Sequence, residues 1–241
     1  MRSLGVRSFA WALSLLLLAA SAARAQSCEP EDISERKALE AAIKKCDSIA
    51  ATTTNSTERY AALCRCASYS FRIAQVAEGD DASDWAEHGM KDSSRAKKEN
   101  PQRVEGHYRY ALCLGVYLRE HWTSVVSRLD ELIGSARKAA ELDEKYDAAG
   151  PHVLLASVYA EAPRLIGGDP ARARKHMARF LALFPNDEGN KLAAVKIHVE
   201  LGEEDQARKI LNTIDPKRCR DEAARKELEP ELEKLKKKLA D

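Results

Sequence analysis

The sequence predicts an all-α protein, a right-handed solenoid built from pairs of antiparallel helices. Apolar residues recur at helical spacing along most of the 241 residues, and no run of alternating β-branched residues competes with helix. Two small residues also repeat at a spacing of 34 residues, since Gly168 and Ala173 recur as Gly202 and Ala207. A repeat of this length indicates that one helical hairpin follows another along the chain.

The repeat has the features of the tetratricopeptide repeat (TPR), a helical hairpin of about 34 residues. The repeated alanine lies in the second helix of each pair. Pro185 ends that helix, and Pro216 follows three positions early in the next repeat. Such hairpins bury their apolar faces against neighbouring repeats and form an extended concave surface that binds other molecules. The pattern therefore favours a binding scaffold.

Residues 1–25 are predicted to be a cleaved signal peptide. Arg2 and Arg7 precede an apolar stretch at 9–20, and Ala23-Arg24-Ala25 has the small residues of a cleavage site. The stretch is short for a membrane span, and an uncleaved anchor is the alternative. Cys28 lacks the small-residue box that bacterial lipidation requires. We therefore expect a soluble periplasmic protein rather than a lipoprotein.

Residues 26–100 are expected to form the N-terminal helical hairpins. Helices at 41–50 and 57–77 flank a turn of threonine, asparagine and serine around Asn55. A third helix is expected at 83–99, before an Asn-Pro pair that ends it. These turn residues separate helices because they favour caps and turns over helix interiors.

Residues 101–216 are expected to hold the TPR-like repeats. Helices are predicted at 102–119, 124–142 and 151–162, before the pairs that carry the glycine and alanine repeat. Asp169 is a good N-cap for the helix that follows it. Pro170 suits the first helical position, where the backbone N–H has no helical partner.

Residues 217–241 are predicted to form a charged capping helix. Its apolar residues form one seam, which consists of Leu228, Leu232, Leu235 and Leu239. A repeat array needs a polar terminal helix to cover its last apolar face, and this segment fits that task. Pro230 is expected to interrupt the helix because proline lacks a backbone N–H.

All six cysteines follow the predicted cleavage site, which favours disulfide bonds in an exported protein. They are Cys28, Cys46, Cys64, Cys66, Cys113 and Cys219. Cys46 and Cys64 each lie nine residues from Asn55, so antiparallel helices place them at one height and predict the bond Cys46–Cys64. Cys66 lies about 200° around the helix from Cys64, which favours Cys113 as its partner. Cys28 and Cys219 then pair by elimination.

The alternative for Cys64-Arg65-Cys66 is a redox or metal site. Redox cysteines usually lie at an electropositive helix start, whereas Cys64 is expected in mid-helix. No metal-binding histidine motif, phosphate loop or dinucleotide fingerprint occurs in the sequence, and His152 and His198 fall at packing positions. We therefore expect no enzyme activity, no cofactor and no metal.

The charge of the chain argues against a nucleic-acid partner. The sequence has 39 basic and 38 acidic residues, and the predicted signal peptide holds three of the arginines and none of the acids. The mature chain therefore carries 36 basic against 38 acidic residues, a net charge of −2. No basic stripe with interleaved aromatic residues is present. We also expect no strong membrane association.

Several motifs between 142 and 173 resemble the T-component of tripartite ATP-independent periplasmic (TRAP) transporters. The stretches are Leu142-Asp143-Glu144-Lys145-Tyr146, Gly150-Pro151-His152, Tyr159-Ala160-Glu161-Ala162-Pro163, Gly167-Gly168-Asp169-Pro170 and Ala173. The resemblance covers about residues 101–215. It implies a helical solenoid with a central cavity or pore, and a role as an accessory to the solute-binding protein of such a transporter.

The expected binding groove is lined by first-helix positions that the packing does not use. In the repeat register these are Tyr108, Arg109, Ser157, Glu161, Lys196 and Glu200, while Arg164 and Asp169 border the long loop. Their mixed charge suits a polypeptide or a small polar ligand, and we expect a protein partner. The alternative function is a structural cell-envelope assembly factor unrelated to transport.

Overall fold

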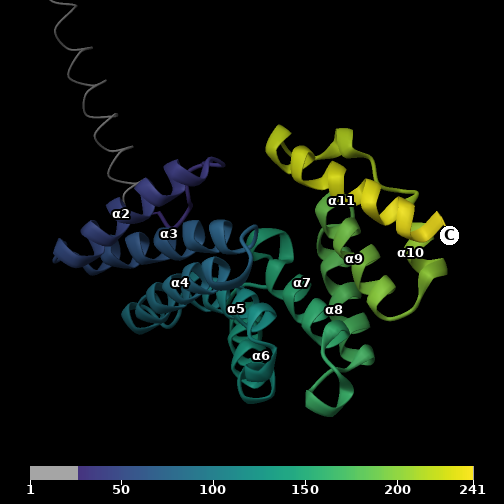
Figure 1. The fold of residues 1–241 in the computed structure, drawn as a ribbon, viewed down its shortest axis with the longest axis horizontal. Coiled ribbons are helices and arrows are strands. Elements are labelled where there is room, and N and C mark those ends of the chain that lie inside the picture. The colour runs from purple at the N-terminus through teal and green to yellow at the C-terminus, as the bar shows by residue number, and fades with distance from the viewer. Residues whose placement is uncertain (1–26, 241) are drawn as a thin grey trace, which may run out of the picture. The chain divides into compact units, whose positions relative to one another are not determined.

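The computed structural model describes residues 27–240, and this part of the chain is all-helical (Figure 1). It contains ten α-helices and three short 3-10 helices, with no strand among these residues. The expected all-α class is therefore confirmed. None of the helices at 27–240 is long and apolar enough to span a membrane. The predicted signal peptide at 1–25 lies outside the described residues.

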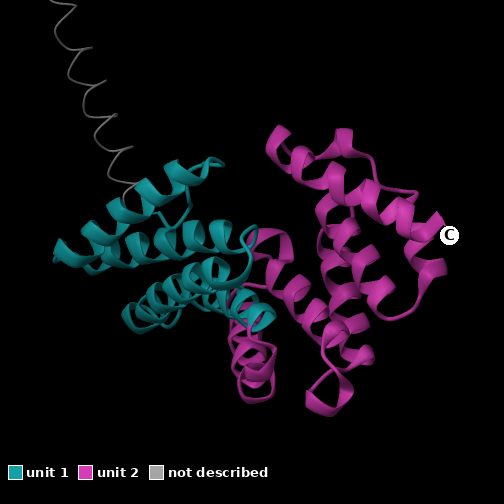
Figure 2. Ribbon diagram, viewed as in Figure 1, with its two compact units in different colours: residues 1–120 teal, residues 121–241 magenta. Residues whose placement is uncertain are grey.

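The chain divides into two compact units, residues 1–120 and 121–241 (Figure 2). The boundary expected between 100 and 101 lies inside the first unit, in the loop between two of its helices. The described part of the first unit consists of α2 (Arg36–Thr52), α3 (Ser56–Ala74), α4 (Gly79–Glu99) and α5 (Val104–Glu120).

Helix α3 forms the centre of the first unit, because it contacts α2, α4 and α5. Asn55 begins the helix, and its side-chain oxygen accepts hydrogen bonds from the backbone N–H groups of Thr57 and Glu58 at 2.9 and 3.1 Å. Tyr60 and Leu63 are buried at 2 % and 0 % exposure. The buried positions of α3 carry mostly apolar or small residues, as a helix packed on several neighbours requires, while Arg59, Arg65 and Arg72 are half-buried.

The second unit carries the repeat. Its elements are η1 (Trp122–Ser124), α6 (Val125–Leu142), α7 (Tyr146–Glu161), η2 (Arg164–Ile166), α8 (Pro170–Leu183), α9 (Glu188–Glu200), α10 (Glu204–Leu211), η3 (Pro216–Arg218) and α11 (Glu222–Ala240). Each helix packs on its neighbour, and α7 also packs on α9. The first helices of consecutive pairs are thus adjacent, which is the arrangement that stacked hairpins require.

The repeated alanines lie at buried positions, and the repeated glycines lie in the turns before their helices. Ala173 and Ala207 are both completely buried. Gly168 lies so near the preceding loop that an added Cβ would meet the Ala162 carbonyl oxygen at 1.7 Å. Gly202 has a φ of 72°, which favours glycine. The repeat therefore reflects close packing and turn geometry.

Helix α11 covers the end of the second unit, as the capping prediction required. Its four leucines are buried in one cluster with residues of α9 and α10, among them Val195 and Leu211. The expected interruption at Pro230 is wrong, because α11 is continuous from Glu222 to Ala240. Pro230 lies on the exposed side of the helix, where water can satisfy the carbonyl that loses its N–H partner.

Candidate binding site

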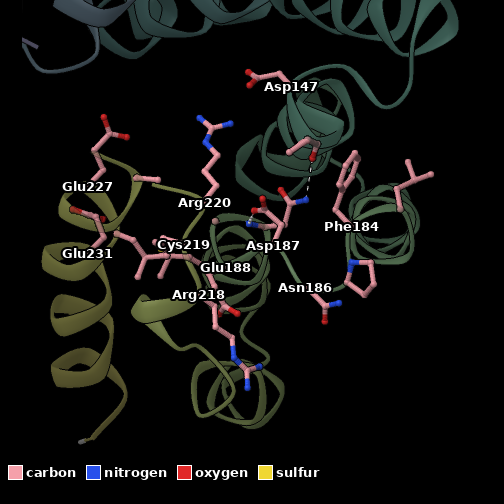
Figure 3. Close-up of a pocket in the computed structure, with 18 of the residues that line it drawn as sticks. Asp147, Phe184, Asn186, Asp187, Glu188, Arg218, Cys219, Arg220, Glu227 and Glu231 are labelled. Carbon is pink, nitrogen blue, oxygen red and sulfur yellow. Dashed lines mark hydrogen bonds between the residues drawn. The ribbon is translucent and has the colours of Figure 1, made fainter. Parts of the chain in front are cut away.

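A pocket of about 690 Å³ opens in the second unit between the start of α7, the α8–α9 loop, α9 and α11 (Figure 3). This volume is in the range of small-molecule and peptide-side-chain sites. Phe184, Leu192 and Leu228 supply apolar lining. Its charged lining residues are Asp147, Asp187, Glu188, Lys196, Arg218, Arg220, Glu227 and Glu231.

Charged side chains of both signs surround the opening. Lys196 of α9 and Glu231 of α11 form an ion pair at 2.9 Å, and both side chains are more than two-fifths exposed. In Figure 3, Glu227 and Glu231 line the α11 side, while the guanidinium group of Arg220 extends away from Arg218. An exposed ion pair contributes little to stability, so Lys196 and Glu231 can exchange partners at small cost.

Buried polar groups fix the floor of the pocket. Glu188 is 2 % exposed, and its carboxylate accepts hydrogen bonds from the Lys191 ammonium at 2.8 Å and the Asp215 backbone N–H at 3.0 Å. The Asn190 side-chain amide donates to the Ala148 carbonyl at 2.9 Å. Because buried groups of this kind are satisfied, the floor is rigid.

The rim of the pocket contains unusual backbone geometry. Asp147, Ala148 and Ala149 have φ values of 50°, 52° and 65°, which residues other than glycine seldom adopt. Each such residue costs on the order of 1 kcal/mol or more and persists only where the surroundings impose it. Here the amide of Asn190 holds the segment through the Ala148 carbonyl. Strain of this kind occurs mainly at functional sites.

Three of the residues predicted to line the groove interact electrostatically, and one of them, Lys196, also lines the pocket. Burial raises the pKa of the Glu161 carboxyl on α7, the charge of Glu200 raises it further, and the charge of Lys196 lowers it. The three charges therefore interact across the contact between α7 and α9. Ser157 lies one turn before Glu161 on α7 and is half-buried. We call the surface of Ser157, Glu161, Lys196 and Glu200 the α7–α9 face.

The other four predicted groove residues lie elsewhere. Tyr108 belongs to the first unit and is a core residue at 5 % exposure, because its register position faces inward on α5. The Arg109 guanidinium lies 5.5 Å from the ring of Tyr108. Arg164 is exposed in η2. Asp169 is the N-cap of α8 and accepts hydrogen bonds from the Ala171 and Arg172 N–H groups, so its carboxylate is already used.

Sequence reasoning missed most of the pocket wall. Arg218, Arg220, Glu227 and Glu231 follow the last repeat, in a segment that was expected only to cover apolar surface. In α11 the buried leucines recur at helical spacing, so the sequence pattern pointed to the apolar seam and not to the pocket wall. The turn at Asp147 was also missed, since its sequence contains no glycine at the left-handed positions.

The histidines lie as their packing positions predicted. His198 is 9 % exposed, and its Nδ1 lies 2.7 Å from the Glu203 carboxylate. His152 is mostly buried, with its Nε2 3.5 Å from the Glu144 carboxylate. Its Nδ1 lies 2.9 Å from Nδ1 of His176. These contacts account for both histidines as structural groups.

All six cysteines carry free thiols in the structure, and their neighbours differ from the expected pairs. The thiol of Cys46 contacts Cys66 and not Cys64. The thiol of Cys64 contacts Cys28. Cys113 is completely buried, while Cys219 lines the pocket of the second unit.

Equal counting from the turn does not explain these pairs. Helix α2 continues to Thr52 and α3 begins at Ser56, so the turn is centred near Thr54, and equal heights would place Ala62 opposite Cys46. The contact between Cys46 and Cys66 therefore reflects how α2 packs on α3, which counting residues from the turn does not give.

One cluster has side chains that metal ions accept as ligands. Asp47, Cys66 and Asp92 bring ligand atoms within 4.8 Å of one another. His88 lies beside them, with Nε2 3.3 Å from Asp47 and Nδ1 3.5 Å from Asp92. Burial raises the pKa of the Asp92 carboxyl, which His88 and Arg95 lower in turn. Arg95 donates a hydrogen bond to Oδ1 of Asp92 at 3.2 Å, whereas its buried Oδ2 has no hydrogen-bond partner among the described residues.

Comparison with known proteins identifies one family. The family model described as TRAP transporter T-component matches residues 40–214. The match covers the motifs near 142–173 and extends through most of the first unit. It ends before η3 and α11, so one wall of the pocket lies outside the matched region. No curated protein matches the sequence.

Proposed function

The chain belongs to the TRAP transporter T-component family, and we propose that it is a non-catalytic accessory that holds a protein partner of such a transporter. The family is a transporter component and not an enzyme family. The proposed partner is the periplasmic solute-binding protein of that transporter. The proposed localisation is periplasmic, with export by residues 1–25 and no lipid anchor.

The α7–α9 face is the proposed binding surface. The observation that carries this assignment is the convergence of Glu161, Glu200 and Lys196, with Lys196 also lining the pocket. Lys196 is thus common to the α7–α9 face and to the pocket of the second unit. Charges of both signs on such a surface favour a charged polypeptide segment, because complementary charges give specificity and fast association.

The finer architecture is part of the same proposal. The helical pairs are TPR-like repeats of a right-handed solenoid, and the first hairpin is linked by a disulfide bond. The contact between the two first helices, α7 and α9, supports the repeat assignment. The burial of Ala173 and Ala207 at equivalent positions supports it as well.

The test measures binding between the purified chain and the TRAP solute-binding protein encoded in the same genome. The variant Lys196→Glu breaks the ion pair with Glu231 and places a third acid beside Glu161 and Glu200. We expect Kd to rise about tenfold, which corresponds to about 1.4 kcal/mol. Lys209→Glu is the matched control, because Lys209 is exposed on α10 outside this surface.

The possible outcomes test the proposed partner and the proposed binding surface separately. Equal Kd values for the wild type, Lys196→Glu and Lys209→Glu would contradict the assignment of the α7–α9 face. Absence of binding by the folded wild-type chain at any accessible concentration would contradict the partner, and would favour a role in envelope structure.

A further inference from the structure

Two pairs of thiols meet in the first unit, and both involve the run Cys64-Arg65-Cys66 on α3. The Cys28 thiol is within hydrogen-bonding contact of Cys64, and the Cys46 thiol is in the same relation to Cys66. The four side chains are between 0 % and 5 % exposed. Residues two apart on a helix point to different sides, so the two pairs do not compete.

The position of Cys46 opposite Cys66 is fixed by other contacts. The Cys66 sulfur lies 3.5 Å from the Ile43 carbonyl oxygen and 3.5 Å from the Asp47 carboxylate. Ile43 is one turn before Cys46 on α2, and Asp47 directly follows it. The Cys66 sulfur therefore lies at the height of Cys46, in the apolar cluster that contains both residues.

Cys28 is buried although the chain around it forms no helix. It is packed among Ala50, Tyr60 and Leu63 in the same cluster as Cys64. The following segment is attached to α3, where the Tyr69 hydroxyl accepts a hydrogen bond from the Glu31 N–H at 2.8 Å. Terminal segments are usually poorly ordered unless contacts hold them. A bond between Cys28 and Cys64 would therefore anchor the segment before α2 to α3.

We propose that Cys28–Cys64 and Cys46–Cys66 are disulfide bonds in the exported protein, and that they link the N-terminal segment and α2 to α3. This inference rests on the proposed export, because disulfides persist in oxidising compartments. It specifies the connectivity of the disulfide-linked hairpin. Cys113 remains a thiol, since it is completely buried and none of the other described cysteines belongs to its contacts, and Cys219 is left without a partner in this connectivity.

The oxidant is a protein or small-molecule disulfide. Cys46 attacks one sulfur of that disulfide as the thiolate, and the oxidant releases its other sulfur as a thiolate. Cys66 then attacks the mixed disulfide, which forms the Cys46–Cys66 bond and releases the second thiolate. The two cysteines lose two protons and two electrons, and the oxidant gains both electrons. The Cys28 and Cys64 pair undergoes the same net change.

The neighbouring carboxylates offer Cys66 a competing role as a metal ligand. Asp47 and Asp92 lie within ligand distance of its sulfur. A metal ion such as zinc would need the Cys66 thiolate, and this thiolate is lost when the disulfide forms. The two states are therefore mutually exclusive, and one experiment distinguishes them.

Trypsin separates the two pairs, because Arg65 lies between Cys64 and Cys66. The full chain is oxidised with glutathione disulfide, free thiols are blocked with N-ethylmaleimide in mildly acidic buffer, and the unfolded protein is digested without reductant. We expect peptide 46–59 to be joined to peptide 66–72, and the Cys28 peptide ending at Arg36 to be joined to peptide 60–65. Cys113 and Cys219 should carry the maleimide.

Three results would overturn the connectivity. Peptide 46–59 joined to 60–65 would restore the pairing Cys46–Cys64. Maleimide on both Cys46 and Cys66 after oxidation would mean that no bond forms between them. The chain could also be loaded with zinc and then dialysed against zinc-free buffer. If it retained one equivalent of zinc and Cys66 was not in a disulfide bond, the cluster would be a metal site. Each result is read from the wild-type chain and does not depend on a variant that folds.

The same mapping on protein isolated from its own host tests export separately. Suppose that glutathione disulfide forms both bonds in the purified chain while the protein from the host has only thiols. In that case the connectivity holds and the proposed periplasmic location fails. If the host protein has both bonds but does not bind the solute-binding protein, the location and the connectivity hold, and the proposed partner fails.

Discussion

At the scale of single residues, Gly89 on α4 is the glycine of the described first unit with the least room for a side chain. An added Cβ would lie 2.5 Å from the Cys113 sulfur and 3.3 Å from the Ser70 Cβ. Because Cys113 is completely buried, its sulfur has little room to move. Overpacking of this kind costs about 1–3 kcal/mol. Gly89→Ala should therefore lower the free energy of unfolding by this amount in urea titrations.

The matched control for Gly89→Ala is Gly134→Ala on α6. No atom lies within 4 Å of a Cβ added at Gly134. Alanine is favoured over glycine in a helix by about 0.5–1 kcal/mol, so this variant should stabilise the chain slightly. Equal effects of the two substitutions would mean that the contact between α4 and Cys113 is not close.

A second prediction at this scale concerns His176, whose Nδ1 lies 2.9 Å from Nδ1 of His152. Burial, with the neighbouring charge of His152, lowers the pKa of His176 to about 4. The unfolded chain binds the proton near the ordinary pKa of about 6.5. The folded state therefore loses stability as pH falls from about 6.5 to about 4. Since the ring is partly exposed, we expect a loss of about 1–2 kcal/mol.

The measurement compares urea unfolding at several pH values for the wild type, His176→Gln and the control His121→Gln. His176→Gln should flatten the change in stability over the window between pH 4 and 6.5, while His121→Gln should keep it. A slope that is unchanged by His176→Gln would assign the pH dependence to other groups. The carboxylates with lowered pKa, such as Glu144, act in all three proteins.

At the scale of the helices, α11 combines a well-packed seam with an unfavourable residue. Pro230 lies inside the helix and removes one backbone hydrogen bond. Proline costs up to about 3 kcal/mol relative to alanine in a helix interior. Pro230→Ala should therefore raise the free energy of unfolding by about 1–3 kcal/mol. Lys237→Ala, an exposed substitution on the same helix, should change it by less than about 0.5 kcal/mol.

Sequence reasoning predicted helices well where glycine, proline and caps mark their ends. Asp169 and Pro170 begin α8 as expected, and the Asp169 carboxylate accepts the two capping hydrogen bonds. Helix α4 begins at Gly79, four residues before the expected start, because its first turn is polar and carries no apolar period. The continuity of α11 across Pro230 was not predictable, since it depends on the packing of the flanking leucines.

At the scale of the whole molecule, the family follows from the sequence but the site follows only in part. The motifs at 142–173 indicated the family that the match at 40–214 shows. Glu161, Lys196 and Glu200 were predicted from the repeat register, which brings first-helix positions together, and their role in binding stays a prediction. The pocket wall on α11 and the cysteine pairs depend on three-dimensional packing of segments with no periodic signal, so the sequence alone did not specify them.

The central proposal is that the α7–α9 face and its adjoining pocket hold a protein partner. Amide hydrogen exchange of the chain, alone and saturated with the TRAP solute-binding protein, tests this most directly because it maps the contact without substitutions. We predict slower exchange at 157–161, 183–200 and 218–231, with α6 unchanged. Protection confined to other helices, or none at all with the partner bound, would contradict the account.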